Sequence, residues 1–80
     1  MKTKIYCIFD VIANEGGNVY VAKNDEVARR MLERIIPDVK VRNEHKLILL
    51  GSFETEELDL VPSKPEIVWL KGVEIEDDAE

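Results

Sequence analysis

The chain has 80 residues, of which 45% are hydrophobic and 35% charged, as is typical of one small globular domain and not of a disordered or fibrous chain. Its single cysteine excludes an intramolecular disulfide, so we expect an intracellular protein. The net charge is −6, and the charged residues are unevenly distributed. Residues 1–50 carry nine Lys/Arg and seven Asp/Glu, whereas residues 51–80 carry two Lys/Arg and ten Asp/Glu. Because phosphate contacts need basic side chains, the acidic part is poorly suited to nucleic acid.

No segment is suited to a membrane or to export. A membrane-spanning helix needs about 18 or more consecutive apolar residues, and the sequence has no such run. The apolar run near the N-terminus stops at Asp10 after five residues, and no small-residue cleavage site follows it. We therefore expect neither a membrane span nor a secretory signal.

The first two expected elements are strands joined by a hairpin. Residues 2–10 are rich in β-branched and aromatic types, with apolar side chains on both faces, and predict a strand. Residues 14–18, Asn-Glu-Gly-Gly-Asn, are turn formers and predict the hairpin loop, with Gly16 and Gly17 supplying positive φ. Residues 19–22 then predict a second strand, antiparallel to the first.

A helix is predicted next. The Asn24 side chain can accept hydrogen bonds from the first-turn amides, and Asp25 and Glu26 place negative charge at the positive end of the helix dipole. Pro37 ends the helix. Between these limits the apolar residues recur at helical spacing and form a stripe that can face a sheet: Val27, Ala28, Met31, Leu32 and Ile35.

The second half of the chain predicts two more strands. Residues 38–45 are polar and form a connector, and the apolar run at 46–53 indicates a central strand with neighbours on both sides. Residues 54–65 are acidic and end in two prolines, so we expect a loop, followed by a final strand at 66–71 with Trp69 in the core. Residues 1–73 form the single domain, and residues 74–80 an acidic C-terminal tail.

These elements predict an α+β fold in the order strand, strand, helix, strand, strand, with a four-stranded, largely antiparallel sheet and one helix on one face. One helix cannot cover both faces of the sheet. Since three of the strands carry apolar side chains on both sides, we expect a homodimer that buries the second face.

The sequence offers little for catalysis or metal binding. His45 and Cys7 are its only histidine and cysteine, and although such a pair can form a nucleophilic site, Cys7 lies in an apolar strand and His45 beside a connector. Zinc needs more ligands of this kind than the sequence contains. We expect no enzyme, no metal and no cofactor. One acidic cluster lacks the glycine turn and alternation of a calcium loop: Glu54, Glu56, Glu57 and Asp59.

A nucleic-acid interface is the remaining candidate site. Basic side chains on and after the helix can contact phosphates, and two tyrosines can stack on unpaired bases. The competing interpretation is a solvated helix face, with acidic residues among the arginines, and two tyrosines packed in the core. The candidate residues are Arg29, Arg30, Arg34, Lys40, Arg42, Lys46, Tyr6 and Tyr20.

Four segments carry a resemblance to a known family. They are Lys4–Asp10 (KIYCIFD), Ala22–Arg30 (AKNDEVARR), Leu49–Glu54 (LLGSFE) and Lys64–Val68 (KPEIV). In this order they resemble the small nonstructural protein of gokushoviruses, which are microvirus-type bacteriophages with single-stranded DNA genomes. The resemblance implies a non-virion protein in the cytoplasm of the infected bacterium that binds DNA or assists synthesis and packaging of viral single strands. It supplies no functional residues.

Two hypotheses for function follow. The first is a non-enzymatic phage accessory protein that supports single-stranded DNA replication or packaging through weak DNA binding by the basic residues. The alternative is an adaptor or inhibitor that engages a phage replication initiator or a host protein. The net charge favours the alternative, because an acidic protein can mimic nucleic acid toward a basic partner.

Overall fold

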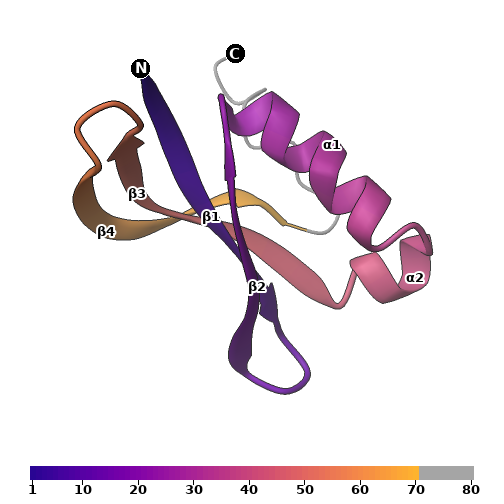
Figure 1. The fold of residues 1–80 in the computed structure, drawn as a ribbon. Helices are drawn as coiled ribbons and strands as arrows, with labels where there is room; N and C mark the ends of the chain where they lie inside the picture. Colours follow the sequence, from indigo (N-terminus) through magenta and orange to yellow (C-terminus); the bar gives the residue numbers. More distant parts are fainter. Residues whose placement is uncertain (71–80) are drawn as a thin grey trace, which may run out of the picture.

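The computed structural model describes residues 1–70, which form one antiparallel sheet and two helices (Figure 1). The acidic tail expected at 74–80 and the end of the expected domain at 73 lie outside the described residues. The elements in chain order are β1 (Lys2–Asp10), β2 (Glu15–Ala22), α1 (Asp25–Ile35), α2 (Val39–Arg42), β3 (His45–Glu54) and β4 (Asp59–Trp69).

The sheet has the spatial order β2-β1-β3-β4, and all neighbouring strands are antiparallel. The predicted α+β class, the antiparallel pairing of the first two strands and the central position of β3 are confirmed. The prediction of one helix is incomplete, because the short helix α2 precedes β3.

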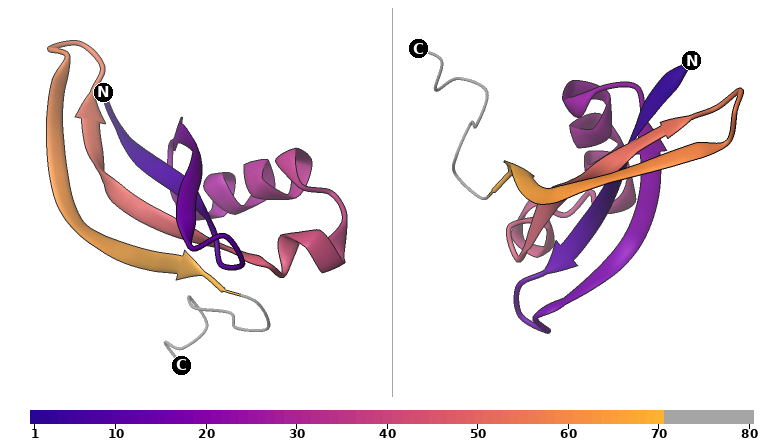
Figure 2. Two further views of the ribbon diagram at one scale, coloured as in Figure 1. Left: turned by 90° about the horizontal axis from the view of Figure 1, so that it is seen from below. Right: turned by 90° about the vertical axis from the view of Figure 1, so that its left-hand side faces the viewer.

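Helix α1 covers one face of the sheet. In the right-hand view of Figure 2 the sheet lies in front and α1 lies behind it. The helix begins as the sequence predicts, since the Asn24 side chain accepts a hydrogen bond from the amide of Val27 at 2.9 Å. It ends at Ile35, two residues before Pro37. No helix within residues 1–70 has the length and apolar character needed to cross a membrane.

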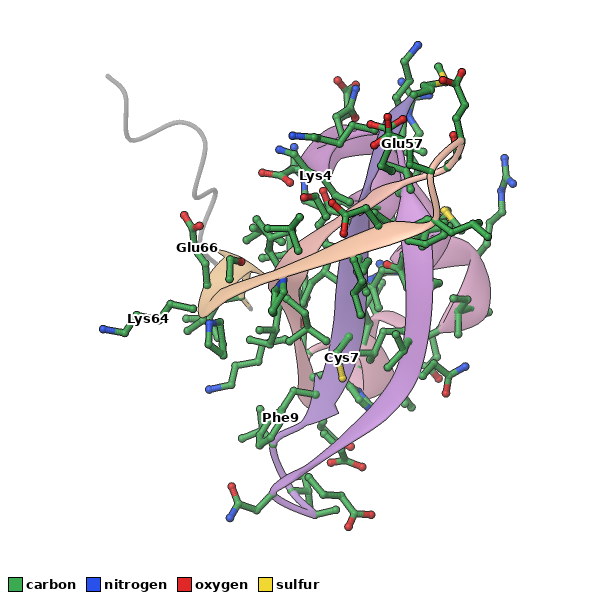
Figure 3. The ribbon with its side chains drawn as sticks, turned by 60° about the vertical axis from the view of Figure 1, so that its left-hand side comes forward. Lys4, Cys7, Phe9, Glu57, Lys64 and Glu66 are labelled. Atoms are coloured by element: carbon green, nitrogen blue, oxygen red, sulfur yellow. The ribbon has the colours of Figure 1, made fainter. Side chains whose placement is uncertain are left out.

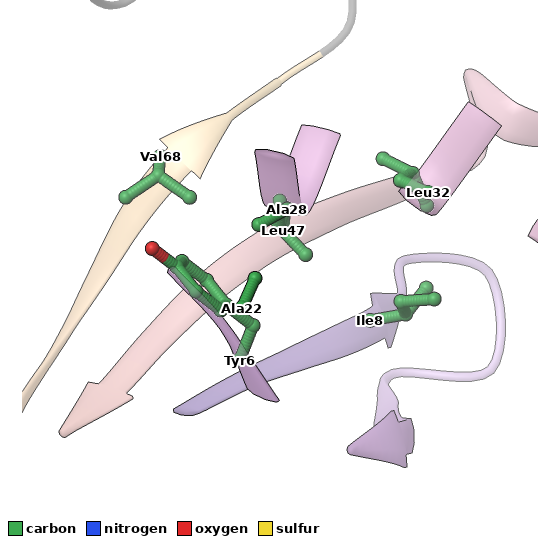
Figure 4. Packing of buried hydrophobic residues seen from close by; sticks show 7 residues of the cluster. All are labelled: Tyr6, Ile8, Ala22, Ala28, Leu32, Leu47 and Val68. Carbon is green, nitrogen blue, oxygen red and sulfur yellow. The ribbon is translucent and has the colours of Figure 1, made fainter. Parts of the chain in front are cut away.

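The core lies between α1 and the sheet (Figure 4). Alternate residues of each strand point toward the helix, and Tyr6 stands opposite Tyr20 and Leu49 in the ladder. Trp69 is partly buried against this core, as the sequence predicts. The fully packed members are Tyr6, Ile8, Ala22, Ala28, Leu32, Leu47 and Val68.

The first hairpin turns earlier than the sequence predicts. The turn occupies residues 11–14, where Asp10 accepts hydrogen bonds from the amides of Ile12 and Ala13, and Asn14 adopts a positive φ of 59°. Gly16 and Gly17 belong to β2 and not to the loop. Gly16 stands opposite Phe9, where a Cβ atom would lie 3.1 Å from the Cys7 sulfur, so a glycine suits this strand position.

The final strand is much longer than the predicted segment at 66–71. Residues 55–58 form the turn, and β4 runs from Asp59 through two prolines. The prediction of a loop at 54–65 is wrong because Pro62 and Pro65 lie on an edge strand, where one side of the backbone needs no hydrogen-bonding partner. β4 also passes close to Gly51: a Cβ atom there would overlap the carbonyl oxygen of Val61 and lie 2.9 Å from Cα of Pro62.

The predicted connector at 38–45 contains α2. The Asp38 side chain caps this helix by accepting a hydrogen bond from the Lys40 amide at 2.9 Å. A single helical turn is too short to produce a periodic apolar pattern, so the charge-rich sequence resembles a loop.

Candidate interaction surfaces

The structure separates the basic candidate residues into groups. Arg29, Arg30 and Arg34 lie on α1, and Lys40 and Arg42 lie on α2. Only residues 36–38 separate α1 from α2, and the two helices meet at one end of the molecule (Figure 1). Arg34 in the last turn of α1 therefore shares this end with Lys40 and Arg42 on α2. We call these three residues the basic end.

Lys46 does not belong to the basic end. It pairs with Phe9 in the β1–β3 ladder, and its ammonium lies 5.2 Å from the centroid of the Phe9 ring. Phe9 faces away from α1, so Lys46 is on the other side of the sheet from the arginines. A single nucleic-acid surface with all six basic residues is therefore excluded.

Several basic side chains also have structural partners. Arg30 pairs with Glu26 at 3.1 Å on the exposed helix surface, and Arg42 donates to the carbonyl oxygen of Ile36 at 3.0 Å, at the end of α1. Arg34 and Lys40 are exposed and form no ion pair or side-chain hydrogen bond with the residues described here. These two are the basic side chains best placed to meet a phosphate.

The two candidate tyrosines are structural. Tyr6 has no exposed surface, and its hydroxyl donates to Asp25 at 2.5 Å. Tyr20 is partly buried, and its hydroxyl donates to the carbonyl oxygen of Ala28 at 2.7 Å. Burial raises the pKa of Tyr20 to about 12, and burial together with the hydrogen bond to Asp25 raises the pKa of Tyr6 strongly. Of the two interpretations of these tyrosines, packing in the core is the one confirmed: they join the sheet to α1, and Tyr6 leaves no surface on which a base could stack.

The sheet face opposite α1 carries an apolar surface. Residues directly opposite in a ladder share a face, and Cys7 stands between Val19 and Ile48. Val19 is 59% exposed and Val21 is 50% exposed. We call this surface the open face and define it as Ile5, Cys7, Phe9, Val19, Val21, Lys46, Ile48, Leu50, Pro65 and Ile67.

The open face contains a shallow hollow of about 320 Å³. Figure 3 shows Cys7 and Phe9, two of its lining residues, on neighbouring positions of this side. Lys46 is the only charged residue in the lining, and its ammonium already contacts the Phe9 ring. The hollow is lined by Cys7, Phe9, Lys46, Ile48, Leu50 and Pro65, a set that suits an apolar partner surface.

Cys7 and His45 are not brought together. Cys7 belongs to the open face, whereas His45 stands opposite Asp10 at the C-terminal end of β1 and lines a separate hollow with Asp10 and Ile36. The His45 Nδ1 atom lies 2.8 Å from the carbonyl oxygen of Val41, and its Nε2 atom lies 3.8 Å from Asp10. Within residues 1–70, no group of three His, Cys, Asp or Glu side chains is arranged to hold a metal ion.

The acidic cluster gathers at the β3–β4 hairpin. Glu54 and Glu56 form ion pairs with the N-terminal ammonium of Met1. This ammonium lowers the pKa of Glu54 by hydrogen bonding to its carboxylate. Glu57 and Asp59 are exposed at the same hairpin, and Figure 3 shows Glu57 there. We call these four residues the acidic hairpin; it lies away from the basic end (Figure 1).

Comparison with known proteins identifies the family. Residues 3–75 match the model of the Phage ORF5 protein family, and this range includes nearly all of β1 and every later element of the structure. The chain belongs to this family. A bacteriophage origin agrees with the resemblance in the sequence. Comparison with curated proteins and with solved structures gives no match.

Proposed function

We propose that this Phage ORF5 family member is a non-enzymatic accessory protein that acts in the cytoplasm of the infected bacterium. It supports replication or packaging of viral single-stranded DNA by weak, sequence-independent contacts with phosphates. The observation that carries the proposal is the basic end, where exposed Arg34 and Lys40 lie near Arg42 at the α1–α2 junction. Three cations on one end can contact an extended phosphate backbone, and the acidic hairpin lies away from them. Exposed Glu33, Asp38 and Glu44 lie on the same segments and reduce this attraction, so the binding is weak.

Weak binding follows from the small number of phosphate contacts. About three neutralised phosphates on a single strand predict a slope near −2 in a plot of log affinity against log salt concentration. No exposed aromatic residue accompanies the basic end within residues 1–70, so stacking adds little there. Binding should be measurable at low salt and weaken steeply as salt rises.

The test is a salt titration with a fluorescent single-stranded oligonucleotide. The double variant Arg34→Gln/Lys40→Gln should weaken binding and make the slope shallower by about 1.4, because two phosphate contacts are lost. The matched control is Lys2→Gln/Lys64→Gln, which makes the same change in net charge on exposed strand positions distant from the basic end. Equal loss of affinity in both double variants would show a general charge effect and would refute an interface at the basic end.

A second candidate function is favoured by the acidic hairpin. Its exposed carboxylates can imitate a phosphate backbone toward a basic protein, as an adaptor or inhibitor of a phage replication initiator or a host protein would require. The Glu56 side chain is 80% exposed, so its carboxylate is accessible to a partner.

Affinity capture from infected cells, with nuclease treatment, separates the two functions. Capture of a defined basic protein that survives nuclease and is lost in Glu56→Gln/Glu57→Gln supports the adaptor. Glu33→Gln/Glu44→Gln is the charge-matched control, because both residues are exposed outside the hairpin. Capture that disappears with nuclease supports the DNA-binding function instead.

A further inference from the structure

The open face is unusual for an uncovered sheet surface. Exposed faces of antiparallel sheets normally carry polar side chains, in alternation with the buried apolar set. Here the residues that alternate with the core are also apolar, and Lys46 is the only charged member of the open face. Both helices lie on the other side of the sheet, so within residues 1–70 no helix packs on the open face (Figure 2).

The hydrophobic core on the helix side is small. Of residues 1–70, only seven are fully packed there. A domain of this size buries roughly 60% of the surface that its unfolded chain exposes, which leaves little apolar burial to offset chain entropy. A second apolar layer on the open face would extend the core through the sheet and add to the stability of the fold.

The geometry of the sheet favours contact through its face. Pro62 and Pro65 interrupt the donor groups of β4, so this edge is poorly suited to extending the sheet with another strand, whereas the opposite edge, β2, contains no proline. The open face offers no such obstacle. Lys46 lies against the Phe9 ring, and the face has no carboxylate among its members, so it presents no charge pattern that would select a charged partner.

The area lies at the lower end of what association with an equal partner needs. Four strands about 4.8 Å apart, with about seven residues each along the face, give a flat footprint of roughly 440 Å². Two such faces in contact bury about 900 Å² before the relief of the side chains is added, which approaches the lower limit of roughly 1,200 Å² for specific interfaces.

From these observations we infer that the open face is the interface between two copies of this chain, packed sheet against sheet about a two-fold axis. An apolar surface with little charge is complementary to itself, and a two-fold contact uses the same patch on both copies. The helices then lie on the outside of the dimer. The basic ends remain accessible, so the dimer does not depend on the proposed DNA binding.

Sedimentation equilibrium over a wide concentration range tests the inference with a matched pair of variants. Val19 on the open face is 59% exposed and Val39 on α2 is 56% exposed, so Val19→Lys and Val39→Lys introduce the same charge at equal exposure. The wild type and Val39→Lys should form dimers, and Val19→Lys should have the mass of a monomer with an unchanged circular dichroism spectrum. A monomeric wild type, or equal dissociation of both variants, would overturn the proposal.

The native thiol locates the interface independently. Cys7 is the only cysteine and lines the hollow of the open face, so a two-fold axis that passes through this hollow brings the two thiols near one another. A short bis-maleimide should crosslink the wild type into a covalent dimer and leave Val19→Lys and Cys7→Ser uncrosslinked. A dimeric mass without this crosslink places the interface elsewhere and refutes the assignment. DNA binding that persists in Val19→Lys would separate failure of the dimer from failure of the proposed function.

Discussion

The two faces of the sheet are built from alternating residues of the same strands but have different surroundings. Leu47 faces α1 and has no exposed surface, whereas its neighbour Ile48 points to the open face and is partly exposed. On the helix side, apolar residues meet a matching stripe on α1; on the other side, equally apolar residues meet no element of residues 1–70. An apolar strand therefore indicates what must be buried, but it does not indicate whether the same chain or another one covers it.

The largest expected effect comes from truncating these two neighbours. Leu47→Ala should lower the free energy of unfolding by about 2–5 kcal/mol, because it removes fully packed atoms and leaves a cavity. Ile48→Ala should lower the free energy of unfolding by less than Leu47→Ala does at low protein concentration, where the open face is solvated. Urea unfolding followed by circular dichroism measures both.

Protein concentration sharpens this comparison. A dimer makes unfolding of the wild type depend on concentration, and Ile48→Ala should reduce that dependence while Leu47→Ala retains it. The two-face distinction would be refuted if both variants lost the same stability at every concentration.

The helix face is also predicted to be sensitive to alkaline pH through its two tyrosines. Folding raises the pKa of both phenols, that of Tyr20 to about 12, so the folded state favours the neutral forms. This contribution is complete below the ordinary tyrosine pKa of about 10 and is lost as pH rises from there toward 12, because the unfolded chain ionises first. Stability should therefore fall above about pH 10.

Tyrosinate absorbance and urea unfolding test this effect together, since Tyr6 and Tyr20 are the only tyrosines. At neutral pH, Tyr6→Phe should cost about 1–2 kcal/mol through loss of the hydrogen bond to Asp25. Tyr20→Phe should remove part of the stability loss between about pH 10 and 12. Ionisation near pH 10 in the folded protein would contradict burial of these rings.

Much of the fold follows from local chemistry in the sequence. Asn24 and Pro37 bound α1, and the apolar run in β3 predicts a central strand, because capping and hydrophobic periodicity act within a few residues. The extent of β4 does not follow, since prolines are acceptable only once the strand is known to be at an edge. The glycines of β2 also depend on spatial neighbours that the sequence does not show: the sulfur of Cys7, 3.1 Å from where a Cβ atom would lie, favours glycine at position 16.

The candidate site was harder to predict than the fold. Helical periodicity places Arg30 and Arg34 on an outer surface, but only the ladder shows that Lys46 lies on the other side of the sheet. For the tyrosines the sequence left stacking and core packing both open, because exposed and buried tyrosines have the same sequence pattern in a strand. The open face had a usable signal: apolar residues on both faces of several strands, more than one helix can cover.

The helix cap provides a smaller test of the same comparison. Asn24→Ala should cost about 1 kcal/mol, since the Val27 amide loses its side-chain acceptor at the start of α1. The cap stabilises only α1, which packs on the side of the sheet opposite the open face. The mass of the Asn24→Ala dimer should therefore equal that of the wild type at concentrations where the protein remains folded. Asn43→Ala is the control, because Asn43 ends α2 without a side-chain cap bond among the described residues. Dissociation of the dimer in Asn24→Ala would show that α1 contributes to association.

The smallest expected effect concerns the exposed surface of α1, where Glu26 pairs with Arg30. Glu26→Gln should lower stability by only about 0.2–0.5 kcal/mol, because the pair is solvated and spaced at i, i+4. The substitution also removes one negative charge from the helix that carries Arg30 and Arg34, so affinity for a single-stranded oligonucleotide at low salt should rise, and the gain should vanish at high salt. Glu66→Gln on β4 is the control for net charge. An equal gain in affinity in the control would mean that DNA binding responds to total charge and not to the helix surface. A gain in affinity confined to Glu26→Gln would place nucleic acid on the helix side, so that the open face remains available for the second copy.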